Sequence, residues 1–357
     1  MGAIAGLSAC SEAEGGRGSG GWTSAASSQS AGDGIGDGIV DPTESGDGGD
    51  GFDDDGDGGD GGNVKFDFPD NGGAGDESSE EDGCQKVDFV FVIDSSPSME
   101  DEQSNLLASF PGFVAAIEDQ LQINDFHVMV VDAGELGGGA CDGTLGAGQI
   151  RSGGGQDCGL VGGQRYATQA QPDLPAAFAC MANRGDSGPT NERTMDSLLQ
   201  AVGLQNLVGN CNDGFLRDDA ILVVTVITDE EDSGADGMPG IPPLDGSCVA
   251  VDEDPNSAGD PAAWKSTLLT AKDGNEDAIV VLGLLGDCDV GGCPGMALDP
   301  FGGAALTGAE PAPRLRAFVE SFAFGTVGPV CAPDYAPFFA SSVNVIESAC
   351  SDFVPPA

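Results

Sequence analysis

The sequence predicts an α/β fold: a Rossmann-like open sheet, mostly parallel, with helices on both faces and disulfide-stapled Gly-rich insertions. Two observations support this prediction. From residue 84 onward, apolar β-favouring runs alternate with segments of helical periodicity. The run at 220–228 is also apolar almost throughout, which indicates a strand buried on both faces, as in the middle of a parallel sheet.

The order of the elements follows from these patterns. Predicted strands cover 87–93, 126–131, 220–228 and 278–285. Predicted helices cover 100–121, 174–181, 193–208, 262–272, 314–322 and 335–350. Pro111 is expected to kink the first helix. A Gly/Cys-rich insertion at 134–171 has no periodicity and is predicted to be irregular.

Composition divides the 357-residue chain into three parts. Residues 1–10 end in Leu-Ser-Ala-Cys, which resembles a bacterial lipobox, so 1–10 is interpreted as a truncated lipoprotein-type signal segment and Cys10 as a lipidation site. The alternative is a plain N-terminus with a chance cysteine. Residues 11–83 form an acidic Gly/Asp-rich segment that is expected to be a disordered linker. Residues 84–353 form the folded domain. These features predict a bacterial cell-envelope protein: an outer membrane lipoprotein, periplasmic or surface-exposed.

The charge of the chain limits its partners. With 12 basic against 60 acidic residues, the net charge is −48. This excludes electrostatic binding to nucleic acid or to an anionic lipid surface, so membrane contact is expected only through the N-terminal lipid anchor. The charge favours cations as partners, although it is equally explained by solubility.

Eleven cysteines are too many for an ordinary cytosolic protein. No C-x-x-C pair occurs and His127 is the only histidine, so a zinc site is not indicated. Disulfides are expected instead. The pairing hypothesis closes the domain with Cys84 and Cys350, and staples each insertion internally through the pairs Cys141–Cys158 and Cys288–Cys293.

Oxygen-bearing side chains follow two of the predicted strands. Asp94, Ser96 and Ser98 come directly after the first strand, and Asp229 follows the strand at 220–228. Ligands of open α/β sheets bind at the carboxyl ends of the strands, and carboxylate and hydroxyl oxygens suit Mg²⁺, Mn²⁺ or Ca²⁺. The alternative for the two serines is capping of the following helix.

A third loop at 188–194 is expected to complete the site, with Thr190 as the first choice of ligand and Thr194 as the reserve. The acids at 230–232 are interpreted as a solvated loop rather than as further ligands.

The pattern strand-Asp-x-Ser-x-Ser, a threonine loop and strand-Thr-Asp resembles the von Willebrand factor type A domain. The segments that carry the resemblance to a myxobacterial lipoprotein subset of that family are 87–113, 215–233 and 331–339. The resemblance implies a metal-ion-dependent adhesion site. Its five positions correspond to Asp94, Ser96, Ser98, Thr190 and Asp229. It implies a divalent cation, Mg²⁺ first and Mn²⁺ or Ca²⁺ next, and a protein partner whose exposed Asp or Glu completes the coordination.

The function expected from the sequence is therefore divalent-metal-dependent protein binding or adhesion, without enzymatic activity. No G-x-S-x-G nucleophile motif occurs, and the position two residues after Asp94 is serine, where aspartyl phosphatases need a second acid. His127 lies on a predicted strand and is expected to be buried rather than catalytic. The alternatives are a structural envelope protein that binds no metal and a metal-dependent hydrolase.

Overall fold

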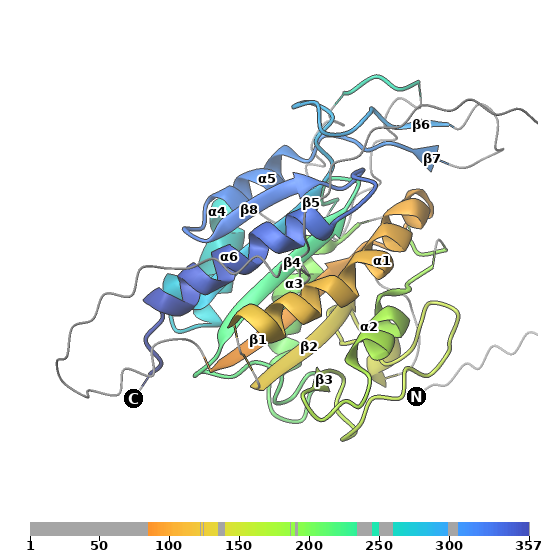
Figure 1. The fold of residues 1–357 in the computed structure, drawn as a ribbon. Helices are drawn as coiled ribbons and strands as arrows, with labels where there is room; N and C mark the ends of the chain where they lie inside the picture. Colours follow the sequence, from red (N-terminus) through yellow and green to blue (C-terminus); the bar gives the residue numbers. More distant parts are fainter. Residues whose placement is uncertain are drawn as a thin grey trace, which may run out of the picture. The chain divides into compact units, whose positions relative to one another are not determined.

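The computed structural model describes residues 85–121, 123, 125–134, 140–185, 187–189, 192–233, 245–249, 260–298 and 306–356. The expected signal segment with Cys10 and the expected linker lie outside these residues. Within the described part, a six-stranded sheet has the order β3-β2-β1-β4-β5-β8 (Figure 1). The six strands are β1 (Lys86–Ile93), β2 (Asp125–Asp132), β3 (Ala167–Thr168), β4 (Ile221–Thr228), β5 (Ile279–Leu285) and β8 (Gly325–Pro329).

Every strand pair in this sheet is parallel except β2 with the short edge strand β3. The predicted mostly parallel α/β open sheet is therefore confirmed. The four strands expected from apolar runs are β1, β2, β4 and β5, and β1 and β4 lie side by side at the centre. A separate two-stranded ribbon pairs β6 (Ala297–Leu298) with β7 (Leu306–Thr307).

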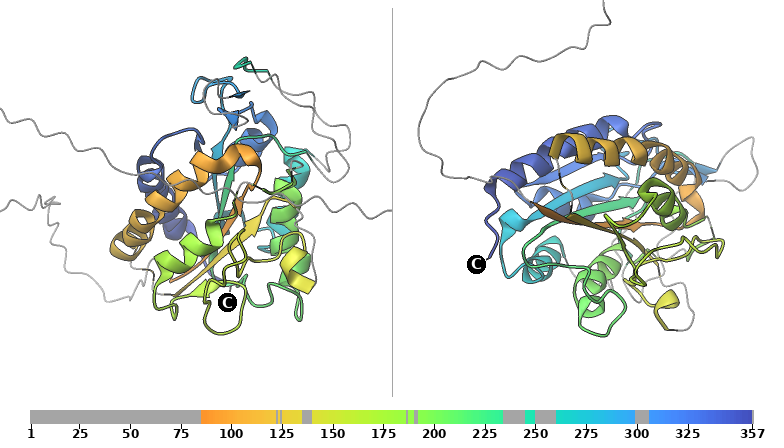
Figure 2. Two further views of the ribbon diagram at one scale, coloured as in Figure 1. Left: turned by 90° about the vertical axis from the view of Figure 1, so that its right-hand side faces the viewer. Right: turned by 60° about the horizontal axis from the view of Figure 1, so that its bottom comes forward.

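Helices cover both faces of the sheet, as predicted (Figure 2). The helices are α1 (Glu100–Ala116), α2 (Leu174–Ala182), α3 (Thr194–Val202), α4 (Pro261–Thr270), α5 (Pro313–Glu320) and α6 (Ala336–Asp352). Alternate residues of β1 point to opposite faces: Phe89 and Phe91 pack with α1, α2 and α6, whereas Val90 and Val92 pack with α3, α4 and α5. Two apolar cores thus hold the central strands in place from either side.

Two predicted helices have different ends in the structure. The first continues through Pro111 but becomes π-helical at Ile117–Leu121. The helix expected at 193–208 ends at Val202, because Gly203 follows and the chain continues in a 3-10 turn at Leu204–Asn206. The structure also contains the strands β3 and β8, which the apolar pattern of the sequence does not predict.

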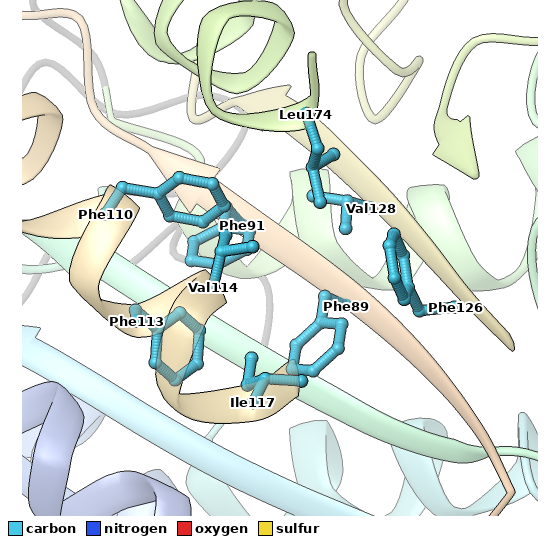
Figure 3. Close-up of a pocket in the computed structure, with 9 residues that line it drawn as sticks. All are labelled: Phe89, Phe91, Phe110, Phe113, Val114, Ile117, Phe126, Val128 and Leu174. Carbon is cyan, nitrogen blue, oxygen red and sulfur yellow. The ribbon is translucent and has the colours of Figure 1, made fainter. Parts of the chain in front are cut away.

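The core against α1 contains a small void between β1, β2, α1 and α2 (Figure 3). Its volume is about 20 Å³ and its lining is apolar throughout, with Phe89, Phe110 and Phe126 among the lining side chains. A space of this size without polar partners does not hold a ligand or a stable water. It is a packing defect beneath the aromatic cluster rather than a binding site.

Disulfides are present as predicted, but two of the predicted pairings are wrong. The pairs are Cys141–Cys211, Cys158–Cys180, Cys248–Cys288 and Cys293–Cys331. Each cysteine of an insertion is therefore bonded to a segment outside it, because the insertions pack onto neighbouring elements instead of closing on themselves. Cys350 is also disulfide-bonded, and its expected partner Cys84 lies outside the described residues.

Among the residues that the structure describes, no helix has the length and apolar character needed to cross a bilayer.

Candidate functional site

The two acids that end the central strands lie at the same edge of the sheet. Asp94 directly follows β1, and Asp229 directly follows β4, its neighbour. The Asp94 N–H donates to the carbonyl of Ile227 at 3.0 Å, which continues the β1–β4 pairing by one residue. The Thr228 hydroxyl donates to Asp94 Oδ2 at 2.8 Å. Both aspartates are completely buried.

The serines of the first loop turn toward Asp94. The Ser96 N–H donates to Asp94 Oδ1 at 2.7 Å, and the hydroxyls of Ser96 and Ser98 are hydrogen-bonded to each other at 2.9 Å. Ser96 precedes the 3-10 helix Pro97–Met99 and Met99 precedes α1, but neither helix start has a side-chain cap hydrogen bond. The geometry therefore disfavours helix capping as the role of these serines. Their hydroxyls bond to each other within the loop instead.

Several buried oxygens around this loop lack hydrogen-bond partners. Within the described residues, no hydrogen bond of acceptable geometry reaches either carboxylate oxygen of Asp229 or of Glu192, or the hydroxyl of Thr194. Ser98 lies near Asp229, and Asp94 lies near Glu192, without forming such a bond. Glu192 lies just before α3, and both Glu192 and Thr194 are completely buried. A buried polar group without a hydrogen-bond partner lowers the stability of the fold. The concentration of such groups here therefore indicates a binding site for a ligand.

Burial and mutual repulsion oppose ionisation throughout this acid cluster. Burial raises the pKa of Asp229 well above its usual range, and the Asp94 carboxylate raises it further, while the Ser98 hydroxyl lowers it. Burial also raises the pKa of Asp94 and, together with Asp94, that of Glu192. Burial raises the pKa of Glu310 to about 7, although the N–H of Glu231, which donates to Glu310, lowers this pKa. None of these acids forms an ion pair with Lys or Arg within the described residues.

The acids after Asp229 do not form the solvated loop that the sequence predicts. Asp232 is buried and its Oδ1 accepts from the N–H of Met195 at 2.9 Å, at the start of α3. Glu231 Oε2 accepts from the N–H of Arg314 at 2.7 Å, at the start of α5. Both side chains thus satisfy free N–H groups at helix N-termini that lie far away in the sequence.

The third loop is only partly described. Thr190, the first choice for its ligand, lies outside the described residues. Thr194, the reserve, is the first residue of α3 and is buried. Glu192, between them, was not singled out by the sequence, because a lone glutamate in a polar loop carries no pattern of its own.

A third strand of the sheet also ends in an acid. Asp132, the last residue of β2, is buried and accepts from the Ser95 hydroxyl at 2.9 Å. Arg184 Nε donates to the other carboxylate oxygen of Asp132 at 3.0 Å. Gln103 Nε2 donates to the carbonyl of Asp94 at 3.2 Å. These hydrogen bonds hold the first loop against β2. Asp132 could have been identified from the sequence, because it is an acid that directly follows the apolar run 126–131.

His127 is partly buried, whereas the sequence predicts a buried histidine. Its Nδ1 lies 2.7 Å from the carbonyl of Phe215, and burial lowers its pKa. It lies near the start of β2, whereas Asp94 and Asp229 follow the ends of their strands.

In the part of the chain that the structure describes, no three His, Cys, Asp or Glu side chains are grouped as a metal site would require. The cation site predicted from the sequence differs from such a group, because only two of its ligands are carboxylates and the others are hydroxyls.

Fold and site together define a class of protein: an open α/β sheet with a buried acid–hydroxyl cluster at the carboxyl ends of its central strands. No family model matches the sequence. No curated protein matches it either.

Among solved structures, the chain has a distant match to proximal thread matrix protein 1 from the mussel byssus. The identity is 10% and the TM-score 0.36, and the match covers 76% of this chain and 49% of that chain. The chain thus spans about half the length of that protein, and a likeness at this level carries no argument about function.

Proposed function

We propose that residues 84–353 form a von Willebrand factor type A-like domain that binds a divalent cation and, through it, a protein partner with an exposed Asp or Glu. Asp94, Ser96, Ser98 and Asp229 would hold the cation, with Thr190 from the third loop. The observation that carries the proposal is the pair of buried Asp229 carboxylate oxygens, which have no hydrogen-bond partner in the described residues and lie beside Asp94.

The chemistry of these side chains suits a hard cation. Carboxylates and hydroxyls are the oxygen ligands of Mg²⁺, Mn²⁺ and Ca²⁺. A bound dication would offset the repulsion between Asp94 and Asp229 and would provide the missing partner for Asp229. The strand order also supports the proposal, because β1 and β4 are adjacent and bring the Asp-x-Ser-x-Ser loop next to the second acid.

The cation site is enclosed. Asp94 and Asp229 have no exposed surface, and Ser96 and Ser98 are 1% and 2% exposed. A partner carboxylate would reach the cation only after the surrounding loops separate. Cation binding and partner binding are therefore separate measurements, and the first can occur without the second.

Envelope localisation, with anchoring through Cys10, belongs to the same proposal. It rests on the lipobox-like sequence and on the disulfides, which are typical of oxidising compartments.

Partner capture tests the adhesive function. We expect the wild-type chain, immobilised in Mg²⁺, to retain a partner from bacterial envelope extract that EDTA releases. Asp94→Ala is expected to retain none, because the first-loop carboxylate is lost. Asp352→Ala removes an equal charge from the exposed end of α6 and is expected to behave as wild type. Capture that is equal with and without EDTA, or equal in Asp94→Ala, would contradict the proposal.

A further inference from the structure

A second site lies beside the acid cluster and is rich in arginine. A pocket of about 280 Å³ is lined by Arg151, Arg165 and Arg184, and among the lining residues that the structure describes Asp142 is the only acid. Three arginines in one pocket are a strong concentration in a chain with 12 basic residues and a net charge of −48. The pocket reaches the first loop through Gly188, whose N–H donates to the carbonyl of Ser95 at 2.9 Å.

Hydrogen bonds, a close backbone contact and a disulfide hold the wall of this pocket in one conformation. Arg184 Nη1 donates to the carbonyl of Arg151 at 2.7 Å, and the N–H of Gly153 donates to the carbonyl of Asn183 at 2.8 Å. A Cβ at Gly153 would lie 1.7 Å from the carbonyl oxygen of Arg184, so this approach requires glycine. The disulfide Cys158–Cys180 fastens the same segment to α2. The arginines are therefore positioned before any ligand arrives.

Two of the guanidinium groups keep free donors. Arg165 uses Nε for the carbonyl of Gly148 and Nη2 for Asp142, and its Nη1 has no hydrogen bond within the described residues. Arg184 uses Nε for Asp132 and Nη1 for backbone carbonyls, and its Nη2 likewise has none there. Arg151 is half exposed, and its contact with Asp157 is long, at 3.9 Å. The pocket thus combines three guanidinium groups, each with one carboxylate partner, with unused N–H groups on two of them.

We propose that this pocket binds a carboxylate group. The planar guanidinium fork matches carboxylate oxygens, and the unused N–H groups of Arg165 and Arg184 are donors from which a carboxylate can accept. A singly charged carboxylate meets less repulsion from the acidic chain than a phosphate dianion does. The volume is at the small end for ligand pockets, which fits a small organic acid or one acidic side chain of a peptide. The site requires no metal ion, so it is independent of the proposed cation site.

The test uses the full, oxidised chain, freed of metal ions on a chelating resin and kept without soluble chelator, at constant ionic strength. Succinate is titrated in one arm and the peptide Ac-Gly-Glu-Gly-Glu-Gly-NH₂ in a second, with inorganic phosphate in a third and sodium chloride as the reference. NMR of the arginine side-chain N–H signals reports binding at individual residues. We expect saturable shifts of the Arg165 and Arg184 signals, with Arg165→Gln and Arg151→Gln each weakening binding about tenfold. Arg316→Gln, which loses an ion pair with the partly exposed Asp289, is the matched control and is expected to bind as wild type.

The arms separate the sources of the carboxylate. Tighter binding of succinate identifies a small organic acid as the natural kind of ligand, and tighter binding of the peptide identifies an acidic segment. Tighter binding of phosphate than of either would overturn the carboxylate assignment. Absence of saturable shifts, or equal affinity in Arg165→Gln and Arg316→Gln, would overturn the site itself. Because the chain and buffers are free of divalent cations throughout, each of these results is independent of cation binding.

Discussion

Asp229→Asn is expected to reverse the stability order of wild type and variant between EDTA and Mg²⁺. In EDTA, the wild type buries a carboxylate whose oxygens have no hydrogen-bond partner in the described residues and which faces Asp94. The amide is nearly isosteric and uncharged, so the free energy of unfolding is expected to rise by about 1 to 3 kcal/mol. In saturating Mg²⁺, the wild type is expected to gain about 4.1 kcal/mol at a thousandfold excess over Kd, and the variant nothing.

Urea denaturation of the oxidised chain, in EDTA and in Mg²⁺ at pH 8, measures both effects. Asp352→Asn changes the net charge equally at an exposed position and is expected to match wild type in both buffers. If Asp229→Asn is less stable than wild type in EDTA, the carboxylate has a structural role and the account of the site is wrong.

Arg217→Met is expected to give the largest loss of stability, at the opposite edge of the sheet. Arg217 donates through its N–H at 2.7 Å and through Nε at 2.8 Å to Asp88, which is completely buried in β1. Its Nη1 also bonds Asp125. The variant keeps the backbone N–H but removes the guanidinium group, which is the ion-pair partner of the buried Asp88. The expected loss at pH 7.5 is about 3 to 5 kcal/mol.

This loss is expected to depend on pH in a defined direction. Burial raises the pKa of Asp88 to about 6, although Arg217 opposes the rise. Because the pKa is higher in the folded state than in the unfolded chain, the contribution of Asp88 to stability is full below about 4 and is lost as pH rises through 6. Without Arg217 the folded pKa is higher still. The cost of Arg217→Met is therefore expected to be smaller at pH 5, where Asp88 takes up a proton.

Urea denaturation at pH 5 and 7.5 tests the prediction, with the double variant Asp88→Asn/Arg217→Met as the control. The amide removes the unpaired charge, so the double variant is expected to recover part of the stability at pH 7.5. A cost that is the same at both pH values, with no recovery in the double variant, would exclude an unpaired Asp88 charge as its source.

The fold was predictable where burial leaves a continuous apolar pattern. The central strands read as unbroken apolar runs, and their order places Asp94 and Asp229 together. The edge strand β8 could not be found in this way, because its sequence Gly-Thr-Val-Gly-Pro has no apolar run. Strand β3 has two residues and lies inside the irregular insertion.

The site was predictable only in part, for a different reason. Asp94, Ser96 and Ser98 lie on one loop, so their spacing is visible in the sequence. Glu192 and Glu310 reach the same cluster from separate loops, and their approach depends on tertiary packing. The roles of Glu231 and Asp232 as partners of distant helix N-termini, and the disulfide pairing across the insertions, are long-range properties of the same kind.

Calorimetric titration of Mg²⁺, Mn²⁺ and Ca²⁺ in turn into the EDTA-stripped, oxidised chain tests the central claim most directly. Salt at 0.15 M screens weak binding to the acidic surface. For at least one of these cations, we predict one saturable site in the wild type and in Asp352→Ala, and none in Asp94→Ala or Asp229→Asn. Absence of a saturable site in the wild type for all three cations, or an unchanged affinity in Asp94→Ala, would contradict the proposal that this edge of the sheet holds a metal ion.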